Sequence, residues 1–378
     1  MAKSASVQPD VLVLGQHPSA YLAALLLRLG KPALNVTQIT IPFEPWPDRL
    51  VLINPNFFTL HPELAKLKKK LNLTGVWGAQ FVSDNPELRS EYRSKTSMGC
   101  VGVYSDLRQA MADLAKEAGA KLLAPESMSI HQVDSIGMEV VCDGKAVLGK
   151  AMLLAGTLPN EDARRLALPE PWNPEVIRRY SYIRLKGGAT GADPAKPIIP
   201  MSLDLGGALT WAWMLPGKGE VQLAVEQPIR GTKTPKQMLE LWAKTLRAHK
   251  LIDGNASIEE EQIHSMDVPA AGALNREPIG NRTLLIGPAG GFFTACLEDI
   301  YPNCWSSTFA VNALRKALKE THLQDALAPY REDWGTTLGE YLRGPQQNLR
   351  FLLPLVYRNA VMTSRLAESI LLGKSVVR

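Results

Sequence analysis

The chain has few cysteines and histidines, and neither type is arranged for metal binding. Its four cysteines, Cys100, Cys142, Cys296 and Cys304, show neither the paired spacing of a zinc site nor the density of a secreted disulfide scaffold. The six histidines are scattered, and none lies in a His-Glu-x-x-His arrangement or beside a Gly-x-Ser-x-Gly turn. We therefore expect no metal site, no hydrolase of these types, and a reducing, cytoplasmic location.

Long hydrophobic runs are also missing. No uninterrupted apolar run reaches the ~20 residues needed to cross a bilayer, and residues 1–9 lack the apolar core of a secretory signal. Residues 351–357, which are flanked by Arg350 and Arg358, form the strongest apolar stretch near the C-terminus. A helix packed on the core is the favoured interpretation, and a peripheral membrane-surface helix is the alternative.

A concentrated charge of one sign is absent too. The net charge of +5 is small for 378 residues, and the basic residues are dispersed except for residues 66–70. Leu64, Leu67 and Leu71 lie on the other side of the same helical pattern, so the lysines are expected to form a solvated face. This predicts no nucleic-acid partner. With 46% hydrophobic residues, the chain can bury a large core.

The most informative segment is a strand that stops at a glycine cluster and is followed by a helix. Residues 283–286 are apolar, residues 287–291 read Gly-Pro-Ala-Gly-Gly, and an alanine-rich helical run covers residues 306–318. Such a strand, turn and helix places unpaired backbone N–H groups where an anionic or electron-rich ligand is favoured. An ordinary connection between a strand and a helix is the alternative.

Period-two alternation predicts further strands in the middle of the chain. Residues 209–214 and 221–225 flank a Pro-Gly-Lys-Gly turn and predict a hairpin that carries Trp211 and Trp213 on one face. Residues 128–133, 138–142 and 146–155 predict an antiparallel meander with a turn at Asp143-Gly144. Strands are also expected at residues 180–186 and 198–203, with a helix at residues 235–249.

These segments resemble the flavoprotein group that contains geranylgeranyl reductases, flavin halogenases and para-hydroxybenzoate hydroxylase-like monooxygenases. In that group a Tyr-x-Trp-x-Phe-Pro-type strand lines the substrate cavity, and a Gly-Asp-Ala-Ala-Gly turn holds the flavin. The resemblance continues in chain order. Residues 11–26 are similar to the group's first strand, phosphate turn and helix, and residues 101–120 to a later strand and helix. Residues 151–166 are similar to the strand and turn before the substrate domain.

The resemblance implies an α/β fold with an α+β substrate layer: a Rossmann-like FAD-binding domain, an inserted antiparallel-sheet substrate domain and a helical C-terminus. The FAD-type domain is expected to be discontinuous, with residues 1–50, 95–172 and 268–320. Residues 51–94 and 173–267 are assigned to the substrate-facing domain, and residues 321–378 to C-terminal helices.

The chain departs from the group's pattern in five of its cofactor-binding features. Glycines let backbone approach a pyrophosphate closely, but after Gly15 the chain has His17 and Ala20 at the later glycine positions. Gln38 stands near the position of the acid that contacts the adenosine ribose. Tyr104 stands where the group commonly has an arginine, and Thr157-Leu158 replaces an Asp-Gly turn. Pro288 replaces the Asp of the flavin turn.

The resemblance nevertheless implies candidate site residues. Glu298 and Asp299 are weak candidates for a catalytic proton donor, and their alternative role is to cap the following helix. His17 could contact a pyrophosphate or cap the first helix. The candidates for cofactor binding are Gly15, His17, Pro18, Ser19, Ala20, Tyr104, Gly287, Pro288, Ala289, Gly290, Gly291 and Ile300, and those for substrate binding are Trp211, Trp213 and Pro216.

Three hypotheses about function follow. The first is an FAD-dependent oxidoreductase, of reductase, monooxygenase or halogenase type, that takes electrons from an external flavin reductase or other donor and acts on an apolar or aromatic small molecule. The second is a flavin-fold protein that has lost FAD and binds an apolar ligand or a protein. The third is a redox-neutral cyclase or isomerase that uses reduced flavin.

Overall fold

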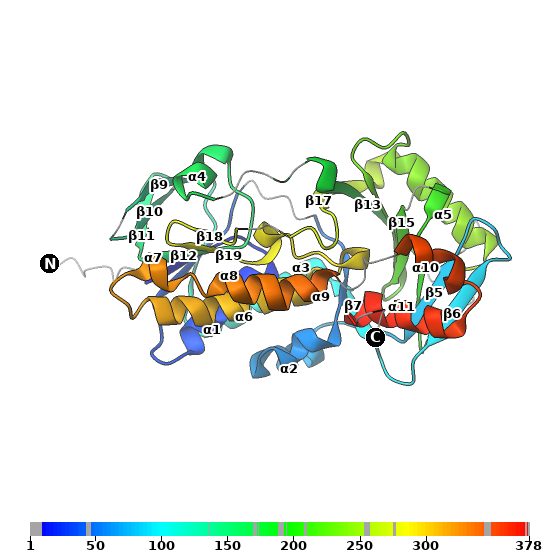
Figure 1. Ribbon diagram of the computed structural model, residues 1–378, viewed down its shortest axis with the longest axis horizontal. Coiled ribbons are helices and arrows are strands. Elements are labelled where there is room, and N and C mark those ends of the chain that lie inside the picture. The colour runs from blue at the N-terminus through cyan, green and yellow to red at the C-terminus, as the bar shows by residue number, and fades with distance from the viewer. Residues whose placement is uncertain are drawn as a thin grey trace.

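The computed structural model describes residues 10–378 except 43–46, 135, 169–171, 173, 188–192, 194, 208–209, 253–257, 275–276, 344–348, 375 and 377–378. Two large sheets lie at opposite ends of an elongated molecule (Figure 1). The six-stranded sheet has the order β18-β19-β12-β1-β2-β8, and the seven-stranded sheet has the order β17-β13-β16-β15-β14-β5-β6. The α/β class and the helical C-terminus are confirmed.

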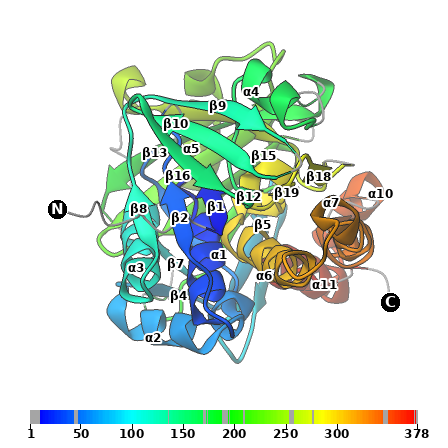
Figure 2. The same ribbon diagram turned by 90° about the vertical axis from the view of Figure 1, so that its left-hand side faces the viewer.

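The six-stranded sheet is parallel except for β18, and its strands are almost continuously apolar because both faces are covered. Helices α1 and α6 cover one face with α3 beside α1, and a three-stranded meander lies over the other (Figure 2). The strands are β1 (Val11–Leu14), β2 (Val36–Ile39), β8 (Lys121–Leu123), β12 (Ala151–Leu154), β18 (Ile279–Gly280) and β19 (Thr283–Leu285), and the helices are α1 (Pro18–Leu29), α3 (Tyr104–Glu117) and α6 (Ile300–Ala317).

Two boundaries differ from the expected ones. The predicted strand at residues 146–155 is two strands, because only β11 joins the meander while β12 pairs in parallel with β1 and β19. Helix α6 begins at Ile300, six residues before the alanine-rich run, because its first turn is built from buried residues that include Pro302. The meander itself is confirmed, with β9 (Met128–Val133), β10 (Met138–Cys142) and β11 (Lys145–Gly149).

The seven-stranded sheet is antiparallel apart from the pairing of β14 with β5. Helix α5 (Pro235–Ala248) covers one face and begins with a capping box formed by Thr234 and Gln237. Helix α11 packs near β5 and β6. The strands are β5 (Gly78–Val82), β6 (Arg89–Arg93), β13 (Ile177–Lys186), β14 (Ile199–Ser202), β15 (Trp211–Pro216), β16 (Glu220–Pro228) and β17 (His264–Pro269). Residue 209, at the predicted start of β15, lies outside the described residues.

A small sheet of β3 (Leu50–Ile53), β7 (Gly99–Val103) and β4 (Thr74–Val76) connects these parts. The remaining helices are α2 (Pro62–Lys70), α4 (Asn160–Arg165), α7 (Leu323–Ala326), α8 (Tyr330–Glu332), a π-helical stretch (Asp333–Leu338), α9 (Gly339–Arg343), α10 (Leu349–Val356) and α11 (Ala360–Leu372). Short 3₁₀ helices cover Pro55–Thr59, Pro174–Val176, Leu205–Gly207, Glu260–Gln262, Gly287–Gly290 and Ala295–Leu297.

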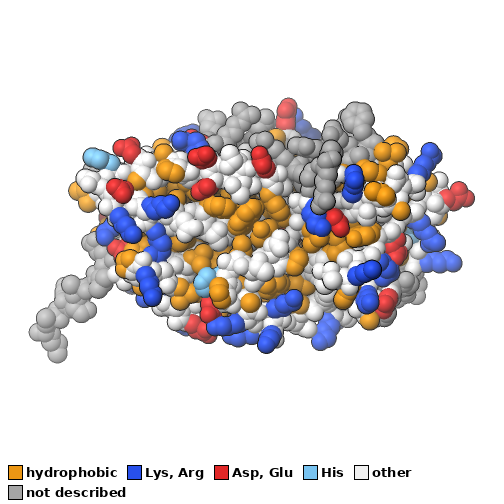
Figure 3. Space-filling view, turned by 60° about the horizontal axis from the view of Figure 1, so that its bottom comes forward, with side chains coloured by type: hydrophobic (Ala, Val, Ile, Leu, Met, Phe, Trp, Pro, Cys, Tyr) orange, Lys and Arg blue, Asp and Glu red, His pale blue; other side chains and the backbone are white. Residues whose placement is uncertain are grey.

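The lysine-rich helix α2 has the expected orientation. Leu64 and Leu67 are buried, and the lysines between residues 66 and 70 are exposed. On the face that Figure 3 brings forward, Lys and Arg side chains are scattered around a band of hydrophobic side chains rather than gathered into one patch. Across the described residues, no helix is long and apolar enough to span a bilayer, and no cluster of three or more His, Cys, Asp or Glu side chains could hold a metal.

The pairing of β5 with β6 requires glycine at position 78. A Cβ atom there would lie 1.9 Å from the carbonyl oxygen of Tyr92 on the neighbouring strand. We expect Gly78→Ala to lower the free energy of unfolding by about 2–3 kcal/mol, because the backbone of β6 must shift to make room. Chemical denaturation followed by circular dichroism measures this difference.

Gly335→Ala is the matched control. Gly335 is exposed in the π-helical stretch with no atom within 4 Å of an added Cβ, so alanine there should be neutral or stabilising by about 0.5–1 kcal/mol. Equal effects of the two substitutions would contradict the steric explanation.

Candidate functional site

The first turn of the six-stranded sheet lies where the strands β1 and β12 end. Gly15 follows β1 with φ 120°, a conformation that favours glycine, and its N–H donates to the carbonyl oxygen of Ile39 at 2.9 Å. A Cβ atom on Gly15 would lie 3.1 Å from Ala155, which follows β12. The glycine expected to open a phosphate turn is thus present, and it also allows close strand packing.

His17 caps helix α1. Its Nδ1 atom accepts a hydrogen bond from the backbone N–H of Ser19 at 3.1 Å and lies 2.9 Å from the Ser19 hydroxyl. Because Nδ1 accepts, the ring proton is assigned to Nε2. The capping hypothesis for His17 is confirmed. The N–H that a pyrophosphate would need at this helix N-terminus is occupied by the chain's own imidazole.

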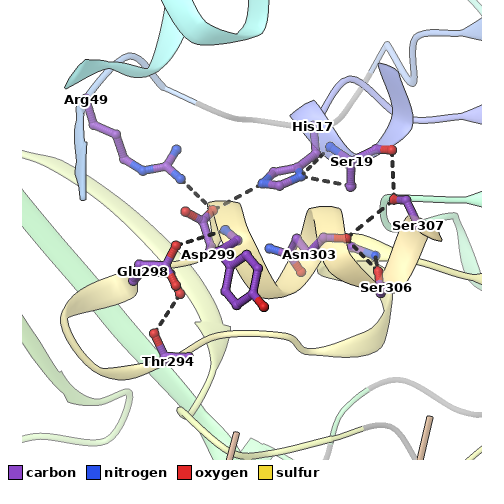
Figure 4. Close-up of polar contacts among 11 residues, drawn as sticks. His17, Ser19, Arg49, Thr294, Glu298, Asp299, Asn303, Ser306 and Ser307 are labelled. Carbon is purple, nitrogen blue, oxygen red and sulfur yellow. Dashed lines mark hydrogen bonds and ion pairs between the residues drawn. The ribbon is translucent and has the colours of Figure 1, made fainter. Parts of the chain in front are cut away.

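Asp299 joins this turn to a distant arginine. Its Oδ2 atom accepts a hydrogen bond from Arg49 Nη2 at 2.7 Å and lies 3.4 Å from His17 Nε2, and all three side chains are fully buried (Figure 4). The Arg49 guanidinium carbon lies 4.2 Å from the centre of the Tyr104 ring. We call His17, Arg49 and Asp299 the buried ion network.

Burial and charge compete within the buried ion network. Burial alone would raise the pKa of Asp299, but the Arg49 charge and the contact with His17 outweigh it and hold that pKa below its ordinary value. Burial lowers the pKa of His17 despite the neighbouring carboxylate. The network therefore consists of a neutral imidazole beside a buried arginine and carboxylate ion pair.

Glu298 is the second buried acid, and it has a different environment. Burial raises its pKa to about 8 and the Asp299 charge adds to this effect, although hydrogen bonds oppose it. Its Oε1 atom accepts a hydrogen bond from the backbone N–H of Tyr301 at 2.9 Å, so Glu298 caps the first turn of α6. The capping alternative thus holds for Glu298, whereas the Asp299 side chain makes no capping bond.

The two glycine-bearing turns touch each other directly. The N–H of Gly287 donates to the Ser306 hydroxyl at 2.9 Å, and a Cβ atom on Gly287 would lie 2.2 Å from the Ser19 hydroxyl. The Ser307 hydroxyl donates to the carbonyl oxygen of Ser19 at 2.9 Å. The turns therefore converge as expected, but side chains of the protein fill the space between them.

The ends of the expected cofactor path are filled as well. Gln38, which is 1% exposed, donates from Nε2 to the carbonyl oxygen of Gly15 across the place expected for the adenosine end. At the other turn, Trp334 and Phe292 pack edge to face at 4.4 Å against Gly290. FAD would need both turns to be open, so the residues present do not fit this cofactor in the position that the resemblance implies.

The two tryptophans of the hairpin lie in the core. Trp213 is fully buried and stacks on Tyr180 at 5.5 Å, and its carbonyl oxygen accepts a hydrogen bond from Trp242 Nε1 at 3.1 Å. Trp211 is 8% exposed, and Pro216 ends the same strand. Core packing, which was the alternative to a substrate wall, describes both indoles.

A cleft of about 610 Å³ lies between β17 and the turn at Pro288, and it adjoins the expected cofactor position because Thr157, Leu158 and Pro288 line it. Its apolar walls include Trp172, Met266 and Phe293. On its polar side, Arg179 contacts Asp267 through two hydrogen bonds of 2.8 and 2.9 Å. The cleft therefore offers an apolar surface with one ion pair.

Comparison with known proteins gives the fold. No protein-family model and no curated protein sequence matches the chain. A geranylgeranyl bacteriochlorophyll reductase-like protein from Thermoplasma acidophilum superposes with a TM-score of 0.75 at 15% identity, over 97% of this chain and 93% of that one. The chain has the fold of FAD-dependent oxidoreductases.

Two halogenase structures show the same flavoprotein fold. The flavin-dependent brominase Bmp2 has a TM-score of 0.68 at 16% identity, over 97% of this chain and 94% of its own. A variant of the halogenase PltM in complex with FAD has a TM-score of 0.65 at 13% identity, over 96% of this chain and 77% of its own. The expected resemblance is confirmed as a likeness of fold.

The structure brings most of the expected cofactor residues together. Pro18, Ser19 and Ala20 form the buried start of α1, Ile300 starts α6 in the core, and Ala289 and Gly291 lie in the turn after β19. Sequence reasoning missed Arg49, which precedes β3, because its partner Asp299 is 250 residues away. Trp172, Arg179 and Asp267 were missed because nothing local marks residues that meet across a cleft.

The adjacent carboxyl groups predict opposite effects of amide substitution. Because the folded protein raises the pKa of Glu298 to about 8, this group costs stability as the pH rises from about 4.5 to 8. Glu298→Gln keeps an acceptor for Tyr301 and should stabilise the protein by about 3 kcal/mol at pH 9, with little effect at pH 5.

Asp299→Asn should instead destabilise by about 3–5 kcal/mol at pH 7, because it leaves Arg49 buried without a counter-charge. The lowered pKa of Asp299 contributes stability above its unfolded pKa, and this contribution is lost on acidification, so the Asn penalty should shrink at low pH. Urea unfolding at pH 4, 5, 7 and 9 measures both differences. The same sign for both variants at pH 9 would contradict the assignment.

Proposed function

We propose that this protein is a flavin-fold binding protein that functions without FAD and holds a small apolar or aromatic molecule in the cleft beside Trp172. The buried ion network carries this proposal. It occupies the turn where a pyrophosphate would bind, and it does so with three fully buried side chains from three separate segments.

Replacement of this network by a cofactor would be costly. FAD could reach the N–H of Ser19 only if His17 left its capping position, which would also remove the contact between His17 and Asp299. Losing the side chain of a helix N-cap typically costs about 0.5–2 kcal/mol, and Asp299 would lose a buried neighbour as well. The cofactor would have to supply that free energy in addition to its own desolvation.

The cleft has the chemistry of a small-molecule site. Its volume of about 610 Å³ falls in the range of ligand pockets, and its walls combine Trp172, Met266 and Phe293 with a small number of polar groups. The Arg179 and Asp267 pair at its polar side favours a ligand with one polar end. An apolar or aromatic molecule with a single polar group is therefore the class of ligand that we propose.

An FAD-dependent oxidoreductase is the second candidate, supported by the fold. The similar structures are reductase-like proteins and halogenases, and one of them contains FAD. That candidate needs the buried ion network to open, as does a cyclase that uses reduced flavin. An external electron donor belongs to this candidate only.

Flavin content separates the two candidates. We expect freshly purified, undialysed protein to show no flavin absorbance and no saturable quenching of FAD fluorescence, because the chain itself fills the pyrophosphate turn. Absorbance spectra and a fluorescence titration with added FAD measure this directly. Stoichiometric FAD in the purified protein would refute the first candidate.

A double substitution gives the converse measurement. His17→Gly with Pro288→Asp restores two residues of the flavoprotein pattern and should increase FAD affinity by about tenfold or more over the wild type. Circular dichroism checks that the variant is folded, and His17→Gly alone is the control for loss of the helix cap.

Ligand binding in the cleft can be measured with Nile red, an uncharged apolar dye. We expect saturable fluorescence enhancement that Ser265→Trp abolishes, because Ser265 lines the cleft and an indole there would fill it. Lys186→Trp, which adds an indole to an exposed position at the far end of β13, the strand that pairs with β17, is the control. Equal binding by wild type and Ser265→Trp would place the dye elsewhere.

A further inference from the structure

A second cavity, of about 450 Å³, lies at the β6 edge of the seven-stranded sheet. Its floor is a row of side chains at paired positions on the neighbouring strands β6, β5, β14 and β15. Glu91 pairs with Gln80, Gln80 pairs with Pro200, and the register of β14 with β15 places Pro200 opposite Met214. The row combines polar and apolar side chains. Helix α5 covers the neighbouring part of the same face, and the segment after its last turn forms one wall.

Cationic side chains dominate the rim of this cavity. Arg89 and Arg93 flank Glu91 on β6 at two-residue spacing, so the three side chains share one face of the strand. Arg93 is paired with Glu91 and also donates to the carbonyl oxygen of Lys196 at 3.0 Å. The backbone of Arg89 pairs with Val82, and its guanidinium group has no hydrogen-bond or ion-pair partner among the residues that the structure describes. Glu91, the one acid among the lining residues, is thus already paired with Arg93.

Lys250 adds a third cation from an unusual backbone position. It follows α5 with φ 58°, a left-handed conformation that a helix end normally gives to glycine, and its N–H donates to the carbonyl oxygen of Arg247 at 2.9 Å. A lysine at this position is conformationally unfavourable.

His249 completes the wall beside Lys250. It is 6% exposed, and its Nε2 atom lies 2.9 Å from the carbonyl oxygen of Ser83, so that atom carries the ring proton. Its Nδ1 atom has no hydrogen-bond partner within the described part of the chain. Nδ1 is therefore a buried acceptor, which an O–H or N–H group of a ligand could satisfy and an oxyanion could not.

We propose that this cavity binds a small organic oxyanion, with its phosphate or carboxylate group against Arg89 and Lys250 and its carbon part on Pro200, Met214 and Leu251. The lining residues include three cations and one carboxylate, which is paired with Arg93, and the apolar floor suits an organic group rather than a bare inorganic ion. The site is independent of the cleft beside Trp172.

Calorimetric titration of the full-length protein at constant low ionic strength tests this site. Phenyl phosphate and benzoate supply the two oxyanions on the same ring, and phenol is the uncharged control. We expect at least one of the two anions to bind saturably and phenol not to bind. Their relative affinity then identifies the preferred oxyanion.

Three single substitutions of cationic residues locate the binding. Arg89→Gln and Lys250→Gly should each weaken binding about fivefold, and Lys250→Gly should not lower the unfolding temperature because glycine suits the left-handed position. Lys244→Gln removes the same charge from an exposed position on α5 outside the cavity and should change affinity less than twofold. Absence of binding by both anions, or an equal loss in Lys244→Gln, would overturn the proposal.

Discussion

The ion pair between Arg49 and Asp299 is the interaction on which the centre of the molecule depends. Two opposite charges without access to water cost several kcal/mol each in desolvation, so their 2.7 Å contact must hold both in place. His17 joins them from a third segment, while its other nitrogen fixes the start of α1. The same three side chains thus link the first helix, the strand β3 and the start of α6, and this is why the phosphate turn of a flavoprotein is a closed part of the core here.

The fold could be predicted from the sequence because its signals are local. Apolar β-branched runs, the Asp143-Gly144 turn and the proline at the start of α5 each act over a few residues. The split between β11 and β12 could not be predicted, because only pairing with β1, about 140 residues earlier, decides which sheet a short strand joins. Tertiary contacts also set the start of α6, which begins before its helix-favouring alanines.

The candidate site was predictable in outline and not in its chemistry. The positions of Gly15 and Gly287 indicated two turns that meet, and the missing acid and glycines were the reason for the alternative hypothesis of a flavin fold without FAD. The identity of the replacement depended on Arg49, whose role appears only when residues 250 positions apart are brought together. Buried tryptophans posed the same difficulty, because period-two spacing places Trp211 and Trp213 on one face without saying whether that face is hollow or packed.

The contact between the Ser307 hydroxyl and the Ser19 carbonyl joins residues 288 positions apart. Strand β1 lies between β2 and β12, which follow it in the chain by about 25 and 140 residues, and the helix α1 packs on α6, which follows later still. Such non-local pairing delays the free-energy gain from ordering β1 and α1 until α6 has been synthesised. During translation the β1–α1 unit therefore leaves apolar surface exposed until these later segments have been made.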